Sequence, residues 1–270
     1  MNFQPLVPVG GLPGWVLLNK TMERQTEVFN KSPQIVRDTD YFEQNIGKIQ
    51  SAEQLVDDRR LLRVALGAFG LGEDLNSQAL VKRILEEGTV SDDALANRLA
   101  DERYKKFTDA FGFGELALPR TQLAGFGREI TDKFRELEFE VAVGEQDESL
   151  RLAMNAQREL ADIVTGDESD NAKWFAIMGN PPLRKVFEVA LGLPSSFGQI
   201  DIDRQLETFK TQASRQLGIE SLADLASEDT NEEFIRRYLL RDQIASFQFQ
   251  SSNSIALTLL QSAPNYFRDA

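Results

Sequence analysis

The sequence contains neither cysteine nor histidine. Without cysteine there is no disulfide, no thiolate nucleophile and no cysteine-ligated zinc, and without histidine the commonest general base and metal ligand is missing. Any catalysis would have to use carboxylates, lysine, tyrosine, serine or a metal held only by oxygen ligands. The redox compartment stays open, because a chain without thiols folds equally well in the cytosol and in an oxidising space.

Long unbroken apolar runs are missing as well. The first 20 residues hold one charged side chain, Lys20, but prolines and glycines interrupt every apolar stretch there, unlike the continuous apolar part of a signal peptide. Nowhere do about 18 apolar residues follow one another, as a membrane-spanning helix requires. We therefore expect a cytoplasmic protein with no transmembrane segment.

Positive charge is scarce. Lysine and arginine total 30 against 43 aspartates and glutamates, which gives a net charge of -13. Such a chain repels phosphate backbones and anionic lipid surfaces, and its basic clusters are only pairs with acids nearby, such as Arg59-Arg60. We expect no nucleic-acid partner.

Helical periodicity dominates what is present. With 270 residues, 41% of them hydrophobic and 27% charged, the chain can bury a real core. Apolar residues recur at steps of three and four throughout, whereas period-two alternation is confined to residues 137–143 and 247–250, neither of which has a hairpin partner. The predicted fold class is all-α, with about a dozen helices and no significant sheet.

Capping residues and glycines bound the expected helices. After Pro13, one helix carries Trp15, Leu18, Met22 and Phe29 on a single face. The strongest apolar stripe comprises Leu123, Phe126, Ile130, Phe134, Leu137 and Val141. Further helices are expected over residues 51–69, 77–88, 91–111, 121–143, 149–166, 181–192 and 201–218, and from a Thr230/Glu233 capping box onward.

An internal repeat is indicated by two segments. Residues 61–71 align without gaps on residues 183–193 with five of eleven positions identical, and each copy ends at Gly-Leu before a polar turn and a further amphipathic helix. Two related helical lobes would explain this, although chance similarity of two leucine-rich helices stays open. The expected divisions are an N-terminal arm with the first helix (1–30), lobe 1 (31–143), lobe 2 (144–250) and a C-terminal segment (251–270), with one compact domain as the alternative.

Motifs that could carry chemistry are weak. Adjacent acids such as Asp57-Asp58 and Asp92-Asp93 point about 100° apart on a helix, and Asp92 and Asp201 stand where helix N-termini favour negative charge. The acidic run 166–171 lacks the glycine and the final glutamate of a calcium loop, and no Gly-Lys-Ser/Thr phosphate loop occurs. We expect no catalytic residue, no cofactor and no metal ligand, so that the chain is not an enzyme.

Two uncharged apolar segments are not well explained as core. Residues 3–12 stand at a terminus, where chains stay mobile unless they are docked, and residues 251–261 contain no charge. Either segment could pack on its own domain, but together they are the candidate surface for a protein partner. The candidate partner-binding residues are Phe3, Leu6, Val7, Val9, Leu12, Ile255, Leu257, Leu259 and Leu260.

Four motifs resemble a family of unknown function. They are PLVPVGGLPGW (5–15), RDTDYFEQNI (37–46), LVDDRRLLRVALGAFGL (55–71) and ALANRLAD (94–101). The family is found chiefly in alphaproteobacteria and is often encoded among flagellar genes, and the resemblance covers nearly the whole chain. It implies an all-α fold, a flagellar role and a flagellar protein partner, but it carries no catalytic residue.

Three functions follow as hypotheses. The first is a non-enzymatic accessory or interaction protein of the flagellar system, in the cytoplasm or at the basal body. The second is an exported rod-associated or axial component, since such proteins leave without a cleaved signal. The third is a metal-dependent enzyme that uses some of the 43 carboxylates.

Overall fold

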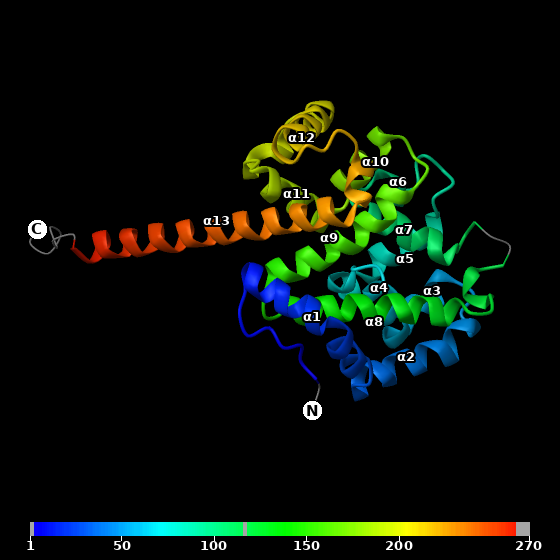
Figure 1. Cartoon of the computed structure of the whole chain (residues 1–270). Helices are drawn as coiled ribbons and strands as arrows, with labels where there is room; N and C mark the ends of the chain where they lie inside the picture. Colours follow the sequence, from blue (N-terminus) through cyan, green and yellow to red (C-terminus); the bar gives the residue numbers. More distant parts are fainter. Residues whose placement is uncertain (1–2, 116–117, 263–270) are drawn as a thin grey trace, which may run out of the picture.

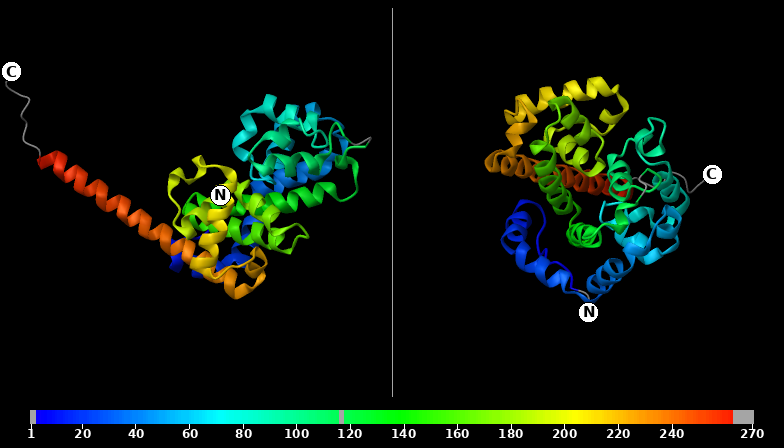
Figure 2. Two further views of the ribbon diagram at one scale, coloured as in Figure 1. Left: turned by 90° about the horizontal axis from the view of Figure 1, so that it is seen from above. Right: turned by 90° about the vertical axis from the view of Figure 1, so that its right-hand side faces the viewer.

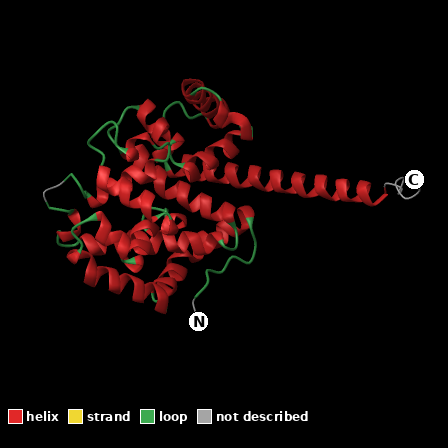
Figure 3. Ribbon diagram, turned by 180° about the vertical axis from the view of Figure 1, so that it is seen from behind, coloured by secondary structure: helices red, strands yellow, loops and turns green. Residues whose placement is uncertain are grey.

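The chain folds into a helical body from which one long helix projects (Figure 1). The computed structural model describes the backbone of residues 3–115 and 118–262 and, except for Ser195, the side chains as far as residue 247. Within these residues the elements are helices and loops, with no strand, which confirms the all-α prediction (Figure 3). The described part contains thirteen α-helices.

The α-helices are α1 (Gly11–Asn30), α2 (Pro33–Asn45), α3 (Ala52–Asp57), α4 (Arg59–Gly67), α5 (Gln78–Glu87), α6 (Leu95–Arg98), α7 (Glu102–Phe111), α8 (Phe126–Gly144), α9 (Glu148–Thr165), α10 (Asp170–Met178), α11 (Pro181–Leu191), α12 (Ile202–Leu217) and α13 (Glu228–Ser262). Short 3₁₀ helices are η1 (Ile46–Lys48), η2 (Gly72–Asn76), η3 (Arg120–Gln122), η4 (Ser195–Gln199) and η5 (Leu222–Ala226).

The consecutive helices α8 and α9 form the centre of the body (Figure 1). Helix α8 packs against α1, α2 and α4, whereas α9 packs against α11, α13 and η5. The predicted boundary between lobes at residue 144 coincides with the end of α8, yet buried residues on both sides form one continuous core cluster. The division into separate domains stays a prediction.

The helices of the two repeat copies, α4 and α11, begin and end in the same way. Asp58 and Asn180, aligned in the repeat, accept hydrogen bonds from the first N–H groups of α4 and α11. Gly70 and Gly192, also aligned, have φ of 68° and 66°. After each glycine, the next residue donates its N–H to the carbonyl five residues earlier, at 2.9 and 2.8 Å. This shared geometry is what a duplication predicts.

Several predicted helices begin at another residue or are broken in two. Residues 51–69 form two helices because Asp58 is extended and caps α4. Residues 91–111 give only the short α6 and then α7, which Asp101 caps. Helix α8 begins at Phe126, after Gly125 with φ of 89°. Helix α13 begins before Thr230, whose N–H bonds to Ser227 Oγ at 3.4 Å, so the predicted Thr230/Glu233 capping box is wrong.

Apolar faces are mostly as predicted. On α1, Trp15, Leu18 and Phe29 are buried, and Met22 packs against the core. In the stripe of residues 123–141 the prediction is partly wrong, because Leu123 and Val141 are exposed while Phe139 and Val143 are buried. A helix within a body is covered from more than one side, which a single stripe does not describe.

Candidate functional site

The N-terminal segment is attached to the body by hydrogen bonds between its backbone and two glutamine side chains. Leu6 donates its N–H to Gln25 Oε1 at 2.5 Å, and the Gln25 amide is 3.4 Å from the Leu6 carbonyl. Gln146, just after α8, donates to the carbonyl of Pro5. Because Gln25 is buried within α1, these contacts give the segment a fixed path over the surface.

The predicted partner-binding residues of this segment divide into two groups. Phe3, Val7 and Leu12 are partly buried and pack against the core cluster. Leu6 and Val9 face solvent, with 66% and 47% of their surface exposed. Three of the five residues therefore pack on the body, and Leu6 and Val9 are the two whose side chains are mostly in solvent.

Helix α13 has a buried root. Phe234, Ile235, Tyr238 and Leu239 are buried in the core, and α13 contacts α9, α11 and α1. The Arg237 guanidinium donates to the carbonyl of Ala190 at 2.9 Å, near the end of α11. These contacts fix the direction in which the rest of α13 leaves the body.

Beyond its root, α13 projects from the body (Figure 2). This part of the helix carries an exposed apolar stripe. Leu240, Ile244 and Phe247 are exposed to 39%, 56% and 63%, at steps of four and three residues. From residue 243 to residue 262 the sequence contains no charged side chain. Of the predicted partner-binding residues, Ile255, Leu257, Leu259 and Leu260 lie on the backbone of α13, but their side chains are outside the described part of the chain.

The start of α1 lies beside α13 at the point where α13 leaves the body. A Cβ added to Gly11 would be 3.2 Å from the side chain of Gln243. Close by, Ser149 at the start of α9 donates to the Asp242 carboxylate at 2.5 Å. The N-terminal segment and the projecting helix therefore meet at one end of the body. The hypothesis that both belong to one partner-binding surface requires this proximity.

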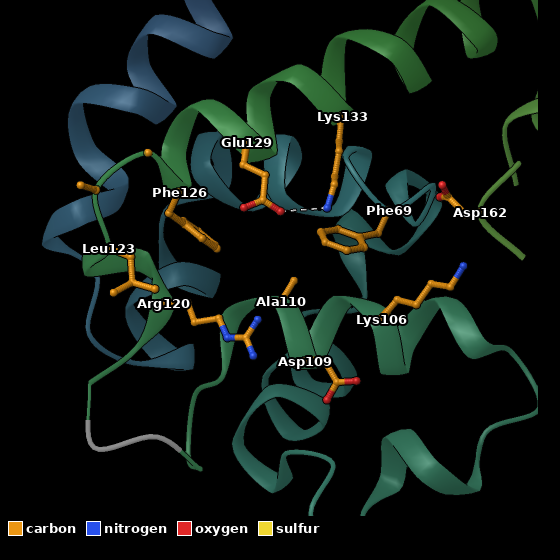
Figure 4. A pocket seen from close by; sticks show the side chains of 12 residues that line it. Phe69, Lys106, Asp109, Ala110, Arg120, Leu123, Phe126, Glu129, Lys133 and Asp162 are labelled. Carbon is orange, nitrogen blue, oxygen red and sulfur yellow. Dashed lines mark hydrogen bonds and ion pairs between the residues drawn. The ribbon is translucent and has the colours of Figure 1, made fainter. Parts of the chain in front are cut away.

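A depression of about 820 Å³ lies between α7 and α8 (Figure 4). Its lining has apolar side chains, three cations and three carboxylates: Phe69, Ala110, Leu123, Phe126, Lys106, Arg120, Lys133, Asp109, Glu129 and Asp162. The Lys133 ammonium pairs with Glu129 at 3.0 Å and stands 5.7 Å from the centre of the Phe69 ring. Balanced charge on an open surface selects neither an anionic nor a cationic ligand.

A larger groove of about 1710 Å³ follows α8 and α9. Asn155, only 8% exposed, lines it, and its Oδ1 has no hydrogen-bond partner within the described chain. Glu159 accepts from Arg158 at 2.5 Å and from Lys106 at 2.9 Å. Burial alone would raise the pKa of Glu159, but Lys106 and Arg158 outweigh it and hold this pKa below its usual value. Glu159, Arg158 and Lys106 thus form an ion-pair network that stabilises the fold. These three residues do not include a nucleophile next to a general base.

The acidic pairs found in the sequence do not converge on a site. Asp58 and Asp201 cap α4 and α12, as expected for a helix N-terminus. Among the described residues, no three acidic side chains come together where they could hold a metal ion. In the same part of the chain no helix has the length and apolarity needed to cross a membrane.

Comparisons with known proteins give one family and one fold. Residues 68–230 match DUF1217, a family of proteins of unknown function. The chain belongs to this family. A crystal structure of a protein from Agrobacterium tumefaciens is similar over 90% of this chain and 99% of its own, with 21% identity and a TM-score of 0.71. At this identity the likeness establishes the fold alone, and no curated protein matches the chain. The match to DUF1217 confirms the resemblance to a family of unknown function.

Proposed function

We propose that this chain is a non-enzymatic helical interaction protein of the bacterial flagellar system, working in the cytoplasm and at the basal body. The observation that carries the interaction role is the part of α13 that leaves the body, where Leu240, Ile244 and Phe247 are exposed to solvent at helical spacing. Apolar patches of this kind mark surfaces that bind a partner. The flagellar setting rests on the resemblance of the motifs at 5–15 and 55–71, which is an associational argument.

A deletion in a motile alphaproteobacterium that carries this gene tests the proposal. We expect loss of swimming or of filaments, restored by the wild-type gene and by Ala245→Glu but not by Ile244→Glu/Phe247→Glu. Ala245 is exposed and lies on the opposite side of α13, so it controls for an added charge. Normal motility and normal filaments in the deletion strain would refute the flagellar role.

Two further measurements address the alternatives. Fractionation of a tagged chain should place it in the cytoplasm and with basal bodies, whereas recovery from filaments or the medium would favour an exported component. Calorimetric titration of the purified chain with magnesium, manganese and calcium should show no binding, and a stoichiometric heat would instead favour a metal-dependent enzyme.

A further inference from the structure

The part of α13 that crosses the edge of the body is basic, although the whole chain is acidic. From residue 234 to residue 262 the sequence contains three arginines and a single acid, Asp242. The Asp242 carboxylate already accepts a hydrogen bond from the start of α9. A chain with a net charge of -13 thus has a local excess of positive charge next to the exposed apolar stripe.

Two of these arginines, Arg237 and Arg241, stand side by side and share one acceptor. Both donate to Gln216 Oε1 on α12, Arg241 at 3.1 Å. Among the described residues, neither guanidinium forms an ion pair with a carboxylate. Burial and the neighbouring Arg241 lower the pKa of Arg237 from its usual value, and Glu233 opposes this shift. Two like charges held by a neutral oxygen favour an anion beside them.

The end of α11 does not account for both guanidinium groups. Arg237 donates to one of the last carbonyls of this helix at 2.9 Å, and Gln216 donates to the next one at 2.9 Å. Arg241 lies directly over Gly192, where a Cβ would collide with it, but it donates to no carbonyl there. Of the five N–H groups in a guanidinium, Arg237 uses two and Arg241 one toward the described chain. Both arginines therefore keep donors for a ligand.

The glycine that aligns with Gly192 in the repeat, Gly70, also has an arginine over it. Arg103 on α7 donates to the carbonyl of Gly70. The same guanidinium makes three hydrogen bonds with the carboxylate of Asp101, at 3.0, 3.1 and 2.7 Å. In the part of the chain that the structure describes, Arg241 has no such carboxylate. A carboxylate from a partner would complete around Gly192 the arrangement that the chain itself completes around Gly70.

We propose that Arg237 and Arg241 bind a carboxylate of a protein partner whose apolar residues cover Leu240 and Ile244. Positions 237, 240, 241 and 244 are three or four residues apart, so they form one face of α13. A partner segment with acidic and apolar residues at a matching spacing meets both parts of this face at once. The inference rests on the proposed function, which uses the same stripe, and it adds the chemistry that selects the partner.

The charge of the body favours a short acidic segment over an extended anionic surface. A lipid bilayer or a nucleic acid that approached Arg237 and Arg241 would also face the rest of a chain with a net charge of -13. A peptide segment contacts the site alone. It also brings apolar side chains to Leu240 and Ile244, which are 39% and 56% exposed.

Selection from a phage library of random dodecapeptides, with the purified full chain as the target, tests the site. We expect the enriched peptides to carry aspartate or glutamate three or four residues away from leucine, isoleucine or phenylalanine. No enrichment, or enrichment of uncharged or basic peptides, overturns the proposal. Co-sedimentation of the chain with phosphatidylglycerol vesicles, in the absence of binding to any acidic peptide, overturns it as well.

Fluorescence anisotropy of the best peptide measures how far the two arginines determine the affinity. Arg237→Gln/Arg241→Gln should raise the dissociation constant at least about tenfold. The control Arg24→Gln/Arg204→Gln removes the same charge from exposed positions on α1 and α12, and it should change the dissociation constant less than about twofold. Equal effects of the two double variants would mean that only the net charge matters, and the site would be refuted.

A double-mutant cycle keeps the test decisive if the loss of both arginines disturbs the end of α11. Arg241→Gln alone leaves the bond from Arg237 to α11 in place, and thermal unfolding verifies that this variant is folded. Replacing the acid of the peptide by glutamine should weaken binding to wild type at least about fivefold, but binding to Arg241→Gln by a smaller factor. Additive effects of the two changes overturn the assignment of the carboxylate to Arg241. These measurements use purified protein, so their failure leaves the motility result, and with it the proposed function, standing.

Discussion

Arg158 on α9 donates two hydrogen bonds to the carboxylate of Glu140 on α8, with N···O distances of 2.8 and 3.2 Å. Both side chains are largely removed from water, and Glu140 is buried. A third hydrogen bond from Arg158 reaches Glu159. The guanidinium thus joins the two central helices of the body, and burial makes each partner dependent on the other.

Removing the guanidinium should destabilise the protein strongly. Arg158→Met keeps most of the apolar stem but leaves Glu140 buried without its partner, and we expect a loss of about 3–5 kcal/mol in the free energy of unfolding. The matched control is Lys133→Met, which breaks the exposed pair with Glu129 and should cost at most about 1 kcal/mol. Urea denaturation of both variants measures the difference. Equal losses would contradict the expectation that the buried ion pair costs more to break than the exposed one.

The two acids of this network should respond to pH with opposite signs. Burial raises the pKa of Glu140 above its usual value in spite of Arg158, so its contribution to stability is complete below the unfolded value of 4.5 and is lost as the pH rises above it. The pKa of Glu159 is lowered, so its contribution is present above 4.5 and is lost as the pH falls.

Substitution by glutamine separates these contributions. From acidic to neutral pH, wild type should lose stability relative to Glu140→Gln and gain stability relative to Glu159→Gln. Free energies of unfolding measured over this pH range test both signs. The same direction of change in the two variants would show that the pKa values of Glu140 and Glu159 are not shifted in opposite directions.

Close packing of α4 on α8 depends on a glycine. A Cβ added to Gly67 would be 2.7 Å from the ring of Phe134, which is fully buried, so the helices or the ring would have to move. We expect Gly67→Ala to cost about 1–3 kcal/mol. Gly72→Ala is the control, because nothing lies within 4 Å of its added Cβ. Thermal unfolding compares the two variants, and similar melting temperatures would mean that the α4–α8 contact adapts.

Helix ends were predictable from the sequence where a capping side chain or a glycine marks them. Helix ends marked by a capping side chain or a glycine, such as Ser51, Asp201 and Gly192, are where they were expected. Two helices were missed, α2 and α10, although Pro33 in the first turn and Ser169 as a cap were available signals. The alternating residues 137–143 and 247–250 form helices, because a short alternation without a pairing strand has nothing to stabilise it.

The sequence does not decide which residues of the two terminal segments are buried, because this depends on contacts with distant parts of the chain. Both terminal segments are uncharged and apolar, but only contacts with Gln25 and Gln146 decide that the first one follows the body. The exposure of Phe247 depends on where α13 ends its contact with α1, which no local pattern states. The partner-binding role of the two segments stays a prediction.

The two termini should differ in their effect on stability. Deleting residues 1–10 removes the buried part of Phe3 and Val7 and leaves Gln25 without the backbone groups it now binds. We expect a loss of about 2–4 kcal/mol, since fully burying one such side chain contributes about 1.5–3 kcal/mol. The milder change Gln25→Leu removes the hydrogen bonds but keeps the segment, and it should give a smaller loss of the same sign.

Deleting residues 248–270 should leave the free energy of unfolding of the body unchanged. Helix α13 has already left the body at this point (Figure 1). Ile244 and Phe247, just before it, are exposed to solvent. Urea unfolding of the truncated chain and of the wild type, under identical conditions, measures the difference. The truncated chain should therefore match wild type in its free energy of unfolding. A large loss would mean that the end of α13 is part of the core, and the interpretation of the projecting helix as a binding surface would then be wrong.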